Sequence, residues 1–324
     1  MPKAIRVHKN GGADVLVFED FQTPNPGPHQ VTVRHKAIGL NFIDVYFRTG
    51  LYPAPSFPFV LGNEGAGDVV ALGKDVTDFK IGDRVAYVSQ LGAYSEERVI
   101  DTKLLVKIPR NISYETAAGM MLKGLTAEYL LKRTFPLKKG QVALIHAAAG
   151  GTGQILCQWA KHLGATVIGT VGGKDKAKIA KKIGCDFVLD TNTDDIAKRV
   201  REITKGVGCD VVYDGVGKTT FIASLDSLKK FGTLASFGNA SGSVDAFNIS
   251  ILAAKGSLYV TRPTLFTHIA DTATLRSMAR NLFRVVGSGV VKIPVNNRFP
   301  LAKAAEAHMA LEARQTTGST VLLP

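Results

Sequence analysis

A short segment near the middle of the chain combines residue types that could hold a pyrophosphate. The apolar run 142–145 has the length of a strand buried on both faces, and small residues follow it directly. Ala148, Gly150 and Gly153 match the spacing of a dinucleotide-binding turn, with alanine in the first glycine position. A helical pattern comes next and ends at Gly164. Because free amides at a helix N-terminus attract phosphate, this segment predicts a dinucleotide site.

The residues after the next strand bear on which dinucleotide binds. In a site for NAD, a carboxylate about 20 positions after the glycines holds the ribose 2′-hydroxyl. The strand at 165–170 has no carboxylate at its tip, and Gly172 and Gly173 leave room for a 2′-phosphate that Lys174 or Lys176 can pair with. The pattern therefore favours NADPH over NADH. The alternative is that these lysines only form the solvated face of the following helix.

A second group of polar residues lies near the N-terminus, at Asn41, Asp44 and Tyr46. Asn41 could donate a hydrogen bond to an acceptor oxygen, Tyr46 could donate another or contact a nicotinamide, and Asp44 could orient either. The alternative is structural, with turn capping by the two shorter side chains and a core position for the aromatic ring. The residues alone do not decide between these interpretations.

The elements that must position these residues fall into two kinds. Up to about residue 120, short apolar or alternating runs such as 31–34 and 84–88 are separated by glycine and proline, which is typical of β structure. From about residue 122, helical patterns alternate with strands at 142–145, 165–170, 187–190, 210–214, 232–237 and 257–261. This alternation predicts an α/β fold with a doubly wound parallel sheet. A helix at 271–287 and strand-like pieces at 298–299 and 320–323 should return to the first domain.

Composition excludes several classes of protein. The chain of 324 residues is long enough for two domains, and no apolar run approaches the length of a membrane span. The N-terminus lacks the apolar core of a signal peptide, so we expect a cytoplasmic protein. The three cysteines have no metal-binding spacing and are expected to be small buried residues. Forty basic and 27 acidic residues give a net charge of +13, but the basic residues are dispersed, so nucleic-acid binding is not favoured.

The chain resembles, from end to end, the zinc-free quinone oxidoreductases of the medium-chain dehydrogenase/reductase superfamily, the group that includes zeta-crystallin. The segments that carry the resemblance are 36–46, Tyr-Pro at 52–53, 61–67, 82–85, 123–126, 146–151, 213–217, 236–239 and 257–263. The resemblance implies a GroES-like β-barrel domain at 1–121, a Rossmann cofactor domain at 122–264 and a return to the first domain at 265–324. It also implies NADPH as cofactor, a quinone as substrate, and a homodimer formed along the edge of the cofactor-domain sheet.

The positions that bind zinc in other members of the superfamily carry different residues here. Zinc-dependent relatives have a cysteine in the segment 39–41 and a histidine in a Gly-His-Glu sequence, where this chain has Asn41 and Asn63. Three scattered cysteines also cannot form the four-cysteine loop of a structural zinc site. We therefore expect no metal, and a hydride acceptor that needs no Lewis acid, such as a quinone. No side chain stands out as a general acid, so the proton could come from water.

By resemblance, Asn41 and Tyr46 match positions near the nicotinamide in relatives. Further positions that match cofactor-binding residues of the family are Thr126, Gly150, Gly151, Thr152, Gly153, Gly215, Val216, Phe237, Gly238, Asn239, Val260, Thr261, Arg262 and Arg314. Thr152 replaces a valine common in relatives, a change of similar volume. Thr191 stands where relatives that strongly prefer NADPH carry a tyrosine, which could weaken the choice of NADPH over NADH.

Two other functions remain open at this point. A zinc-free reductase of enones or enoyl thioesters would use the same hydride donor and also need no metal. An RNA-binding or structural protein could retain the cofactor fold without catalysis. Assays with quinone, enone and thioester panels, and RNA binding near physiological salt, would separate the three.

Overall fold

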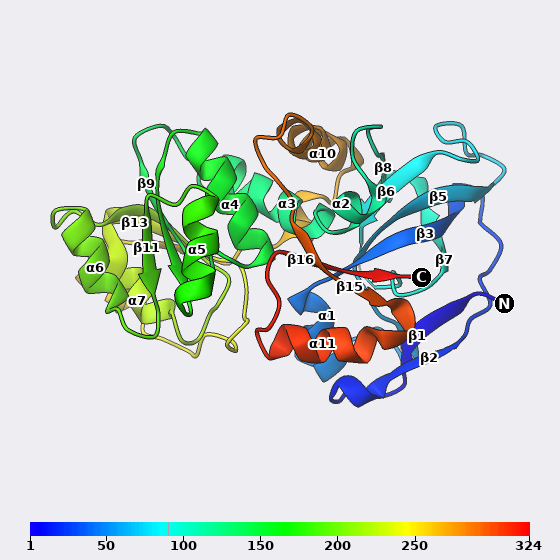
Figure 1. Ribbon diagram of the computed structural model, residues 1–324, viewed down its shortest axis with the longest axis horizontal. Helices are drawn as coiled ribbons and strands as arrows, with labels where there is room; N and C mark the ends of the chain where they lie inside the picture. The colour runs from blue at the N-terminus through cyan, green and yellow to red at the C-terminus, as the bar shows by residue number, and fades with distance from the viewer. Residues whose placement is uncertain (90) are drawn as a thin grey trace. The chain divides into compact units, whose positions relative to one another are not determined.

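The computed structural model describes residues 1–89 and 91–324, which form two compact units (Figure 1). The first unit contains Met1–Leu125, Ile269–Gly287 and Ile293–Pro324, and the second contains Thr126–His268 and Ser288–Lys292. The C-terminal part of the chain thus belongs largely to the first unit. The domain limits expected from the sequence, 1–121, 122–264 and 265–324, stay predictions.

The second unit is built on a six-stranded parallel sheet of order β11-β10-β9-β12-β13-β14. Its strands are β9 (Val142–Ile145), β10 (Thr166–Val171), β11 (Phe187–Asp190), β12 (Cys209–Asp214), β13 (Leu228–Ser236) and β14 (Tyr259–Thr261). Its helices are α4 (Gly151–His162), α5 (Lys174–Lys182), α6 (Ile196–Ile203), α7 (Phe221–Ser227), α8 (Ser250–Ala254) and α9 (Leu265–His268), preceded by a π-helical turn, η3 (Leu130–Thr134). The predicted doubly wound parallel sheet is confirmed.

Side chains alternate between the two faces of each strand, and those on one face of this sheet pack against α6 and α7. Leu144 of β9, Ile168 of β10 and Val212 of β12 share one buried cluster with the apolar residues of α6 and α7. β13 begins earlier than the strand expected at 232–237, because Leu228 already pairs with Cys209, and α7 ends at Ser227 just before it. β9 and β12 are adjacent in the sheet, so their carboxyl ends lie side by side. Between these two strands the chain connections change direction, as they do at the switch point of a doubly wound sheet.

The first unit contains two sheets. One has the order β15-β16-β3-β5-β6-β8, with β7 also paired to β3, and the other has the order β2-β1-β4. The strands are β1 (Lys3–Val7), β2 (Leu16–Asp20), β3 (Gln30–Leu40), β4 (Phe59–Val60), β5 (Glu64–Leu72), β6 (Arg84–Val88), β7 (Glu97–Asp101), β8 (Leu105–Lys107), β15 (Val295–Pro300) and β16 (Ser319–Leu323). β16 pairs antiparallel with β3, so the C-terminal strand is part of the first unit's sheet.

Helices lie around these sheets. They are α1 (Phe42–Thr49), α2 (Tyr114–Ala118), α10 (Thr272–Gly287) and α11 (Ala304–Glu312), with short 3-10 turns η1 (Ala13–Val15), η2 (Thr102–Leu104) and η4 (Leu301–Lys303). α3 (Met121–Tyr129) begins in the first unit and ends in the second. Among the residues described, no helix is both long and apolar enough to cross a membrane.

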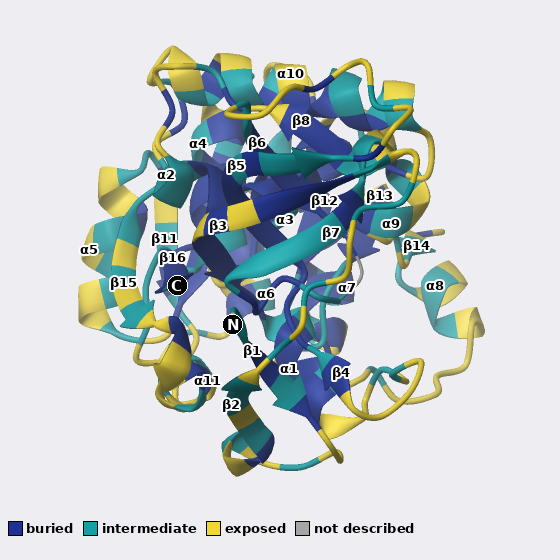
Figure 2. Ribbon diagram, turned by 90° about the vertical axis from the view of Figure 1, so that its right-hand side faces the viewer, coloured by how far each residue is buried: buried dark blue, intermediate teal, exposed yellow. Residues whose placement is uncertain are grey.

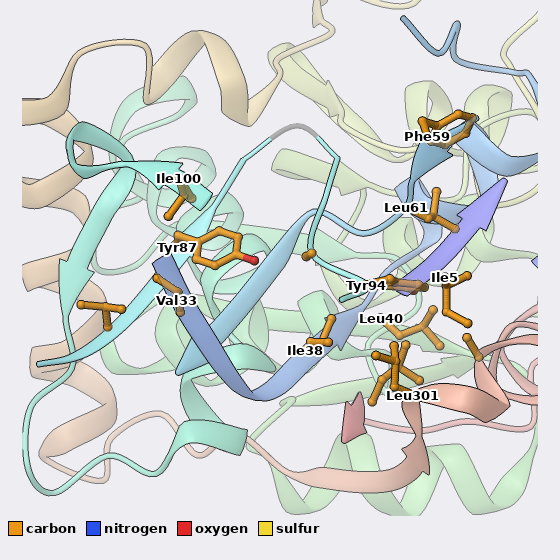
Figure 3. Close-up of a cluster of buried hydrophobic side chains, with 14 of the residues drawn as sticks. Ile5, Val33, Ile38, Leu40, Phe59, Leu61, Tyr87, Tyr94, Ile100 and Leu301 are labelled. Atoms are coloured by element: carbon orange, nitrogen blue, oxygen red, sulfur yellow. The ribbon is translucent and has the colours of Figure 1, made fainter. Parts of the chain in front are cut away.

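The core of the first unit fills the space between its strands and α11. Figure 2 shows that β3 and β6 carry mostly buried residues, and the exposed residues gather on loops and outer helix faces. In Figure 3, Tyr94 lies close to Ile5, Leu40 and Leu61. A β-carbon at Gly62, whose φ is +91°, would lie 2.1 Å from the Tyr94 ring, so glycine is needed there to seat the tyrosine.

Candidate active site

The predicted pyrophosphate turn connects β9 to α4 in the second unit. Gly150 is the N-cap residue of α4, and it has no side chain with which to cap the amides of the first turn. A β-carbon at Gly153 would lie 2.2 Å from the carbonyl oxygen of Ala147, so the helix can approach the turn this closely only with glycine there. Ala147 itself has a φ of +52°, which bends the chain sharply after the strand. The geometry fits a bound diphosphate.

The turn after β10 has the open space expected for a 2′-phosphate. Gly173, with a φ of +99°, is the N-cap of α5, and a β-carbon there would meet no atom within 4 Å. Lys176 is half-buried in the first turn of α5, and Lys174 is exposed. Two lysines therefore lie within three residues after an open turn at a helix N-terminus.

A carboxylate also lies at this turn, and sequence reasoning did not include it. Asp190, at the end of the neighbouring strand, is in register with Val171. Its Oδ1 accepts hydrogen bonds from the amides of Gly173 at 3.1 Å and Asn192 at 3.0 Å. Thr191 is exposed, and its amide and hydroxyl both donate to the carbonyl oxygen of Val171. Asp190 could have been found only by knowing that β10 and β11 end together.

The loops after β12, β13 and β14 bring several predicted residues together. A β-carbon at Gly238 would lie 2.4 Å from the carbonyl oxygen of Gly215, so these loops are in close contact. The amide of Phe237 donates to the carbonyl oxygen of Asp214, and Arg262 donates to the carbonyl oxygen of Ser236 at 3.1 Å. The residues gathered at these strand ends are Gly215, Val216, Phe237, Gly238, Asn239, Val260, Thr261 and Arg262.

A buried polar network supports these strand ends, and sequence reasoning missed it. The carboxylate of Asp214, 1% exposed, accepts from the amides of Val216 and Gly217 and from the hydroxyls of Thr220 and Ser224. The network therefore fixes the loop that contains Gly215 and Val216.

His146 extends the network to the pyrophosphate turn. Ser224 uses its proton on Asp214, so its oxygen accepts from Nε2 of His146 at 3.0 Å. Nδ1 of His146 then accepts from the hydroxyl of Thr170, also at 3.0 Å. Burial lowers the pKa of His146, which keeps the ring neutral for this arrangement. The signal in the sequence was a histidine and an aspartate at the ends of apolar strands.

In the first unit, Asn41, Asp44 and Tyr46 occupy the start of α1. Asn41 is the N-cap residue, and its amide donates to Oδ2 of Asp44 at 2.8 Å, so the structural interpretation of these two residues holds. Asn41 Nδ2 also donates to Oε1 of Glu64 at 2.8 Å. The Tyr46 ring packs edge-on against Tyr52 with centroids 5.2 Å apart. A catalytic role for the three residues stays a prediction.

Asp44 is completely buried, and its environment is mixed. Burial raises the pKa of Asp44 to about 7, and the nearby charge of Glu64 adds to this, against hydrogen bonds from Asn41 and Tyr94 and the charge of Lys123. Its Oδ1 is buried without a hydrogen-bond partner among the described residues. Asp44 can therefore change its protonation state near neutral pH.

Glu64 and Lys123 form a buried ion pair beside Asn41 that sequence reasoning did not assign to the site. Lys123 Nζ lies 3.3 Å from Oε1 of Glu64 and donates to the carbonyl oxygen of Leu40 at 3.1 Å. Oε2 of Glu64 accepts from the amide of Leu122. A β-carbon at Gly39 would lie 2.2 Å from Oε1 of Glu64, so glycine makes room for the carboxylate. The signal was a pair of charged residues in small, apolar segments.

Thr126 and Arg314 are two further residues that the sequence analysis predicted. Thr126 is buried at the start of the second unit, in contact with Tyr129, whose ring stacks on His268 with centroids 4.4 Å apart. Arg314 is exposed just after α11, with a φ of +58°. Their roles at a cofactor stay predictions, as do those of the other residues assigned from the family.

The two positions that distinguish zinc-dependent relatives have structural partners here. Asn41 bonds Glu64, and Asn63 Nδ2 donates to the carbonyl oxygen of Ser89 at 3.0 Å. Across residues 1–89 and 91–324, the structure contains no group of three histidine, cysteine or acidic residues that could hold a metal ion. The three cysteines are free and buried.

Family models match most of the chain. The alcohol dehydrogenase GroES-like domain matches residues 27–133, and the zinc-binding dehydrogenase model matches residues 151–281. The predicted fold class, a GroES-like domain with a Rossmann domain, is confirmed by these matches together with the parallel sheet.

Individual relatives match over the full length. A quinone oxidoreductase of Pseudomonas aeruginosa is 53% identical, with all of both chains covered. A 2-haloacrylate reductase of a Burkholderia species is 46% identical, with 100% of this chain and 99% of the relative covered. The crystal structure of Escherichia coli quinone oxidoreductase complexed with NADPH superimposes with a TM-score of 0.97 at 46% identity, covering 99% of this chain and 100% of that one. The chain belongs to the quinone oxidoreductase family of the medium-chain dehydrogenase/reductase superfamily.

Proposed function

We propose that this protein is an NADPH-dependent quinone reductase that needs no metal. The observation that carries the proposal is the full-length match to quinone oxidoreductases, one of them solved with NADPH, in a chain that retains the open glycine turns. When bound, NADPH supplies a hydride equivalent to the acceptor.

The residues of the second unit would bind and orient the cofactor. The uncapped amides at the start of α4 would hold the pyrophosphate, and Lys176, beside the open turn at Gly173, would hold the 2′-phosphate. The network of His146, Ser224 and Asp214 would keep the loops at the strand ends fixed. Preorganised contacts of this kind reduce the entropy lost on binding.

The residues of the first unit would act on the acceptor. Asn41 and Tyr46 are proposed to orient the quinone, with Glu64 holding the side-chain amide of Asn41 in place. Asp44 is proposed to fix the start of the helix that carries both residues. Because none of these groups polarises a carbonyl as a metal would, electron-poor quinones should react faster than ketones.

A second candidate function is the reduction of activated carbon–carbon double bonds. The 2-haloacrylate reductase, 46% identical over the full length, favours it. The two functions share the hydride donor and differ in the acceptor, so the substrate panel has to decide.

The test is NADPH oxidation, followed by absorbance, with benzoquinone, naphthoquinone, cyclohexenone, 2-chloroacrylate and an enoyl thioester. We expect the highest kcat/KM with a quinone, and the same rate after exhaustive chelation. A preference of more than about tenfold for 2-chloroacrylate, which is about 1.4 kcal/mol in barrier, would transfer the assignment to the second candidate.

We also propose a cytoplasmic homodimer that forms along the β14 edge of the second unit's sheet. The support is a set of exposed apolar side chains on β14, on its neighbour β13 and in the segment that precedes α8: Tyr259, Phe231, Phe247 and Ile249. Tyr259→Lys should produce a monomer in light scattering, whereas Phe187→Lys at the opposite edge should leave the mass unchanged.

A further inference from the structure

A series of buried polar side chains connects two positions of α1, Arg48 and Asp44, through His308 of α11 and Tyr94. Arg48 donates to Nδ1 of His308 at 3.1 Å, and Nε2 of His308 lies 3.1 Å from the hydroxyl of Tyr94. That hydroxyl donates to Oδ2 of Asp44 at 3.0 Å. Asp44, Arg48, Tyr94 and His308 are each no more than 2% exposed. We call these four residues the Arg48–Asp44 chain.

The direction of every hydrogen bond in this chain is fixed by its ends. The guanidinium of Arg48 can only donate, so Nδ1 of His308 must accept. His308 is then neutral with its proton on Nε2, which donates to the oxygen of Tyr94. Burial, with the charge of Arg48, lowers the pKa of His308 to about 3, which agrees with a neutral ring. Tyr94 therefore has its own proton free for Asp44.

The outer end of the chain is anchored by charge. Arg48 makes two hydrogen bonds of 2.8 Å to the carboxylate of Glu312, whose side chain is 37% exposed. It also donates to the carbonyl oxygen of Gly11. A bidentate pair holds the guanidinium plane in one orientation, and so it holds His308.

The inner end meets the start of α1. Oδ2 of Asp44 accepts both from Tyr94 and from the amide of Asn41. The other charged groups that act on Asp44 are Glu64 and Lys123, the buried pair next to Asn41. Figure 3 shows apolar neighbours around Tyr94, among them Ile5, Leu40 and Leu61, so the hydroxyl is held by the chain within an apolar core.

The Arg48–Asp44 chain is suited to hold groups in place and unsuited to conduct protons from solvent. A proton entering from the Glu312 end would have to pass Arg48, which does not give up its proton at accessible pH. Arg48 also occupies Nδ1 of His308 with a donor, so this nitrogen cannot take a proton without losing that bond.

We propose that Tyr94, His308 and Arg48 are positioning residues that hold Asp44 as the acceptor of the Asn41 amide, and so fix the start of α1 with Asn41 and Tyr46. What α1 contributes to turnover rests on the proposed quinone reductase activity. The holding of Asp44 does not depend on that activity.

The test is Tyr94→Phe, with Tyr87→Phe as its matched control. Tyr87 is equally buried, and its hydroxyl bonds another histidine, His35, at 2.6 Å. Loss of a hydrogen bond to a carboxylate should raise the pH at which Asp44 ionises by about one unit. Infrared difference spectra would follow the Asp44 carboxyl band, which is identified by its absence in Asp44→Asn.

Turnover supplies the second measurement. In Tyr94→Phe we expect kcat with quinone to fall about tenfold, with KM for NADPH unchanged within about twofold. In the pH profile of kcat, the pH below which kcat decreases should move up by about one unit. Tyr87→Phe should show neither shift. If Tyr94→Phe does not fold, His308→Gln should move the carboxyl titration in the same direction by a smaller amount.

Several outcomes would overturn the proposal. One is a carboxyl titration that does not move in either variant, and another is an equal shift in Tyr87→Phe. A solvent deuterium isotope effect on kcat that rises in Tyr94→Phe would indicate proton conduction in place of positioning. If the wild-type protein reduced no quinone, the proposed function would fail, and the infrared titration would still decide the role of the chain.

Discussion

Replacing Asp44 with asparagine should change how the stability of this protein depends on pH. Burial raises the pKa of Asp44 from 3.8 to about 7. Between these values the folded protein binds a proton that the unfolded chain does not. The stabilisation from this proton is therefore present at low pH and is lost as the pH rises through about 7.

The size of the effect follows from the two pKa values. A difference of about three pH units corresponds to roughly 4 kcal/mol over the whole range, since one unit is about 1.4 kcal/mol. Between about pH 5 and pH 8.5 the linkage relation leaves about 2 to 3 kcal/mol. Asparagine does not titrate, so the free energy of unfolding of Asp44→Asn, relative to wild type, should increase by that amount across this interval.

The assay is urea unfolding of wild type, Asp44→Asn and Asp75→Asn at closely spaced pH values. The amide nitrogen introduced at position 44 adds a constant cost of about 1 to 3 kcal/mol if it lacks a partner, and this cost does not depend on pH. Asp75 is exposed, and its variant should follow the wild-type curve. Parallel curves for Asp44→Asn and wild type would refute the reasoning, because Asp44 would then ionise alike in both states.

Three further predictions concern binding and acid stability. Lys176→Ala should weaken NADPH binding about 10 to 100-fold, measured by calorimetry, and leave the affinity for NADH unchanged, because a charged hydrogen bond contributes about 1.5 to 3 kcal/mol. Lys178→Ala is the control. An equal loss of affinity for both cofactors would count against a phosphate contact. Asp190→Asn keeps an acceptor for the amide of Gly173 and removes a negative charge, so it should tighten NADPH binding by about fivefold, roughly 1 kcal/mol. Weaker binding of NADPH would show that the Asp190 charge does not repel the 2′-phosphate. Burial lowers the pKa of His35 from 6.5 to about 4, so the free energy of unfolding decreases as the pH falls through this range. His35→Gln should remove up to about 3 kcal/mol of this decrease, whereas replacement of the exposed His29 by glutamine should not. Identical unfolding free energies of His35→Gln and wild type at every pH would show that His35 does not titrate on unfolding.

The sequence was sufficient where chemistry is local. The turn from 142 to 153 contains its own strand, its glycines and its helix, so the positions of Gly150 and Gly153 could be predicted without knowledge of distant contacts. The alternation of strands and helices also specified a parallel sheet. The start of β13 was not predicted, because the strand expected at 232–237 is extended back to Leu228 by pairing with Cys209.

The sequence was insufficient where polar groups meet across long separations. Arg48 and His308 are 260 positions apart, and Lys123 and Glu64 are 59 apart. No period or spacing connects such pairs. They could be recognised only as charged or aromatic residues in segments that are otherwise apolar. Asp190 illustrates the same point, since its importance comes from the register of β10 with β11.

The glycine at the start of α4 has a consequence for the lifetime of the folded chain. Because Gly150 has no side chain, the amides that open the helix must find acceptors in water or in a bound phosphate. A ligand that supplies these acceptors stabilises the folded state by mass action. Deuterium should therefore enter the first turn of α4 more slowly when NADPH is present. The dinucleotide supply of a cell would then govern how long each molecule resists proteolysis, in addition to how fast it turns over.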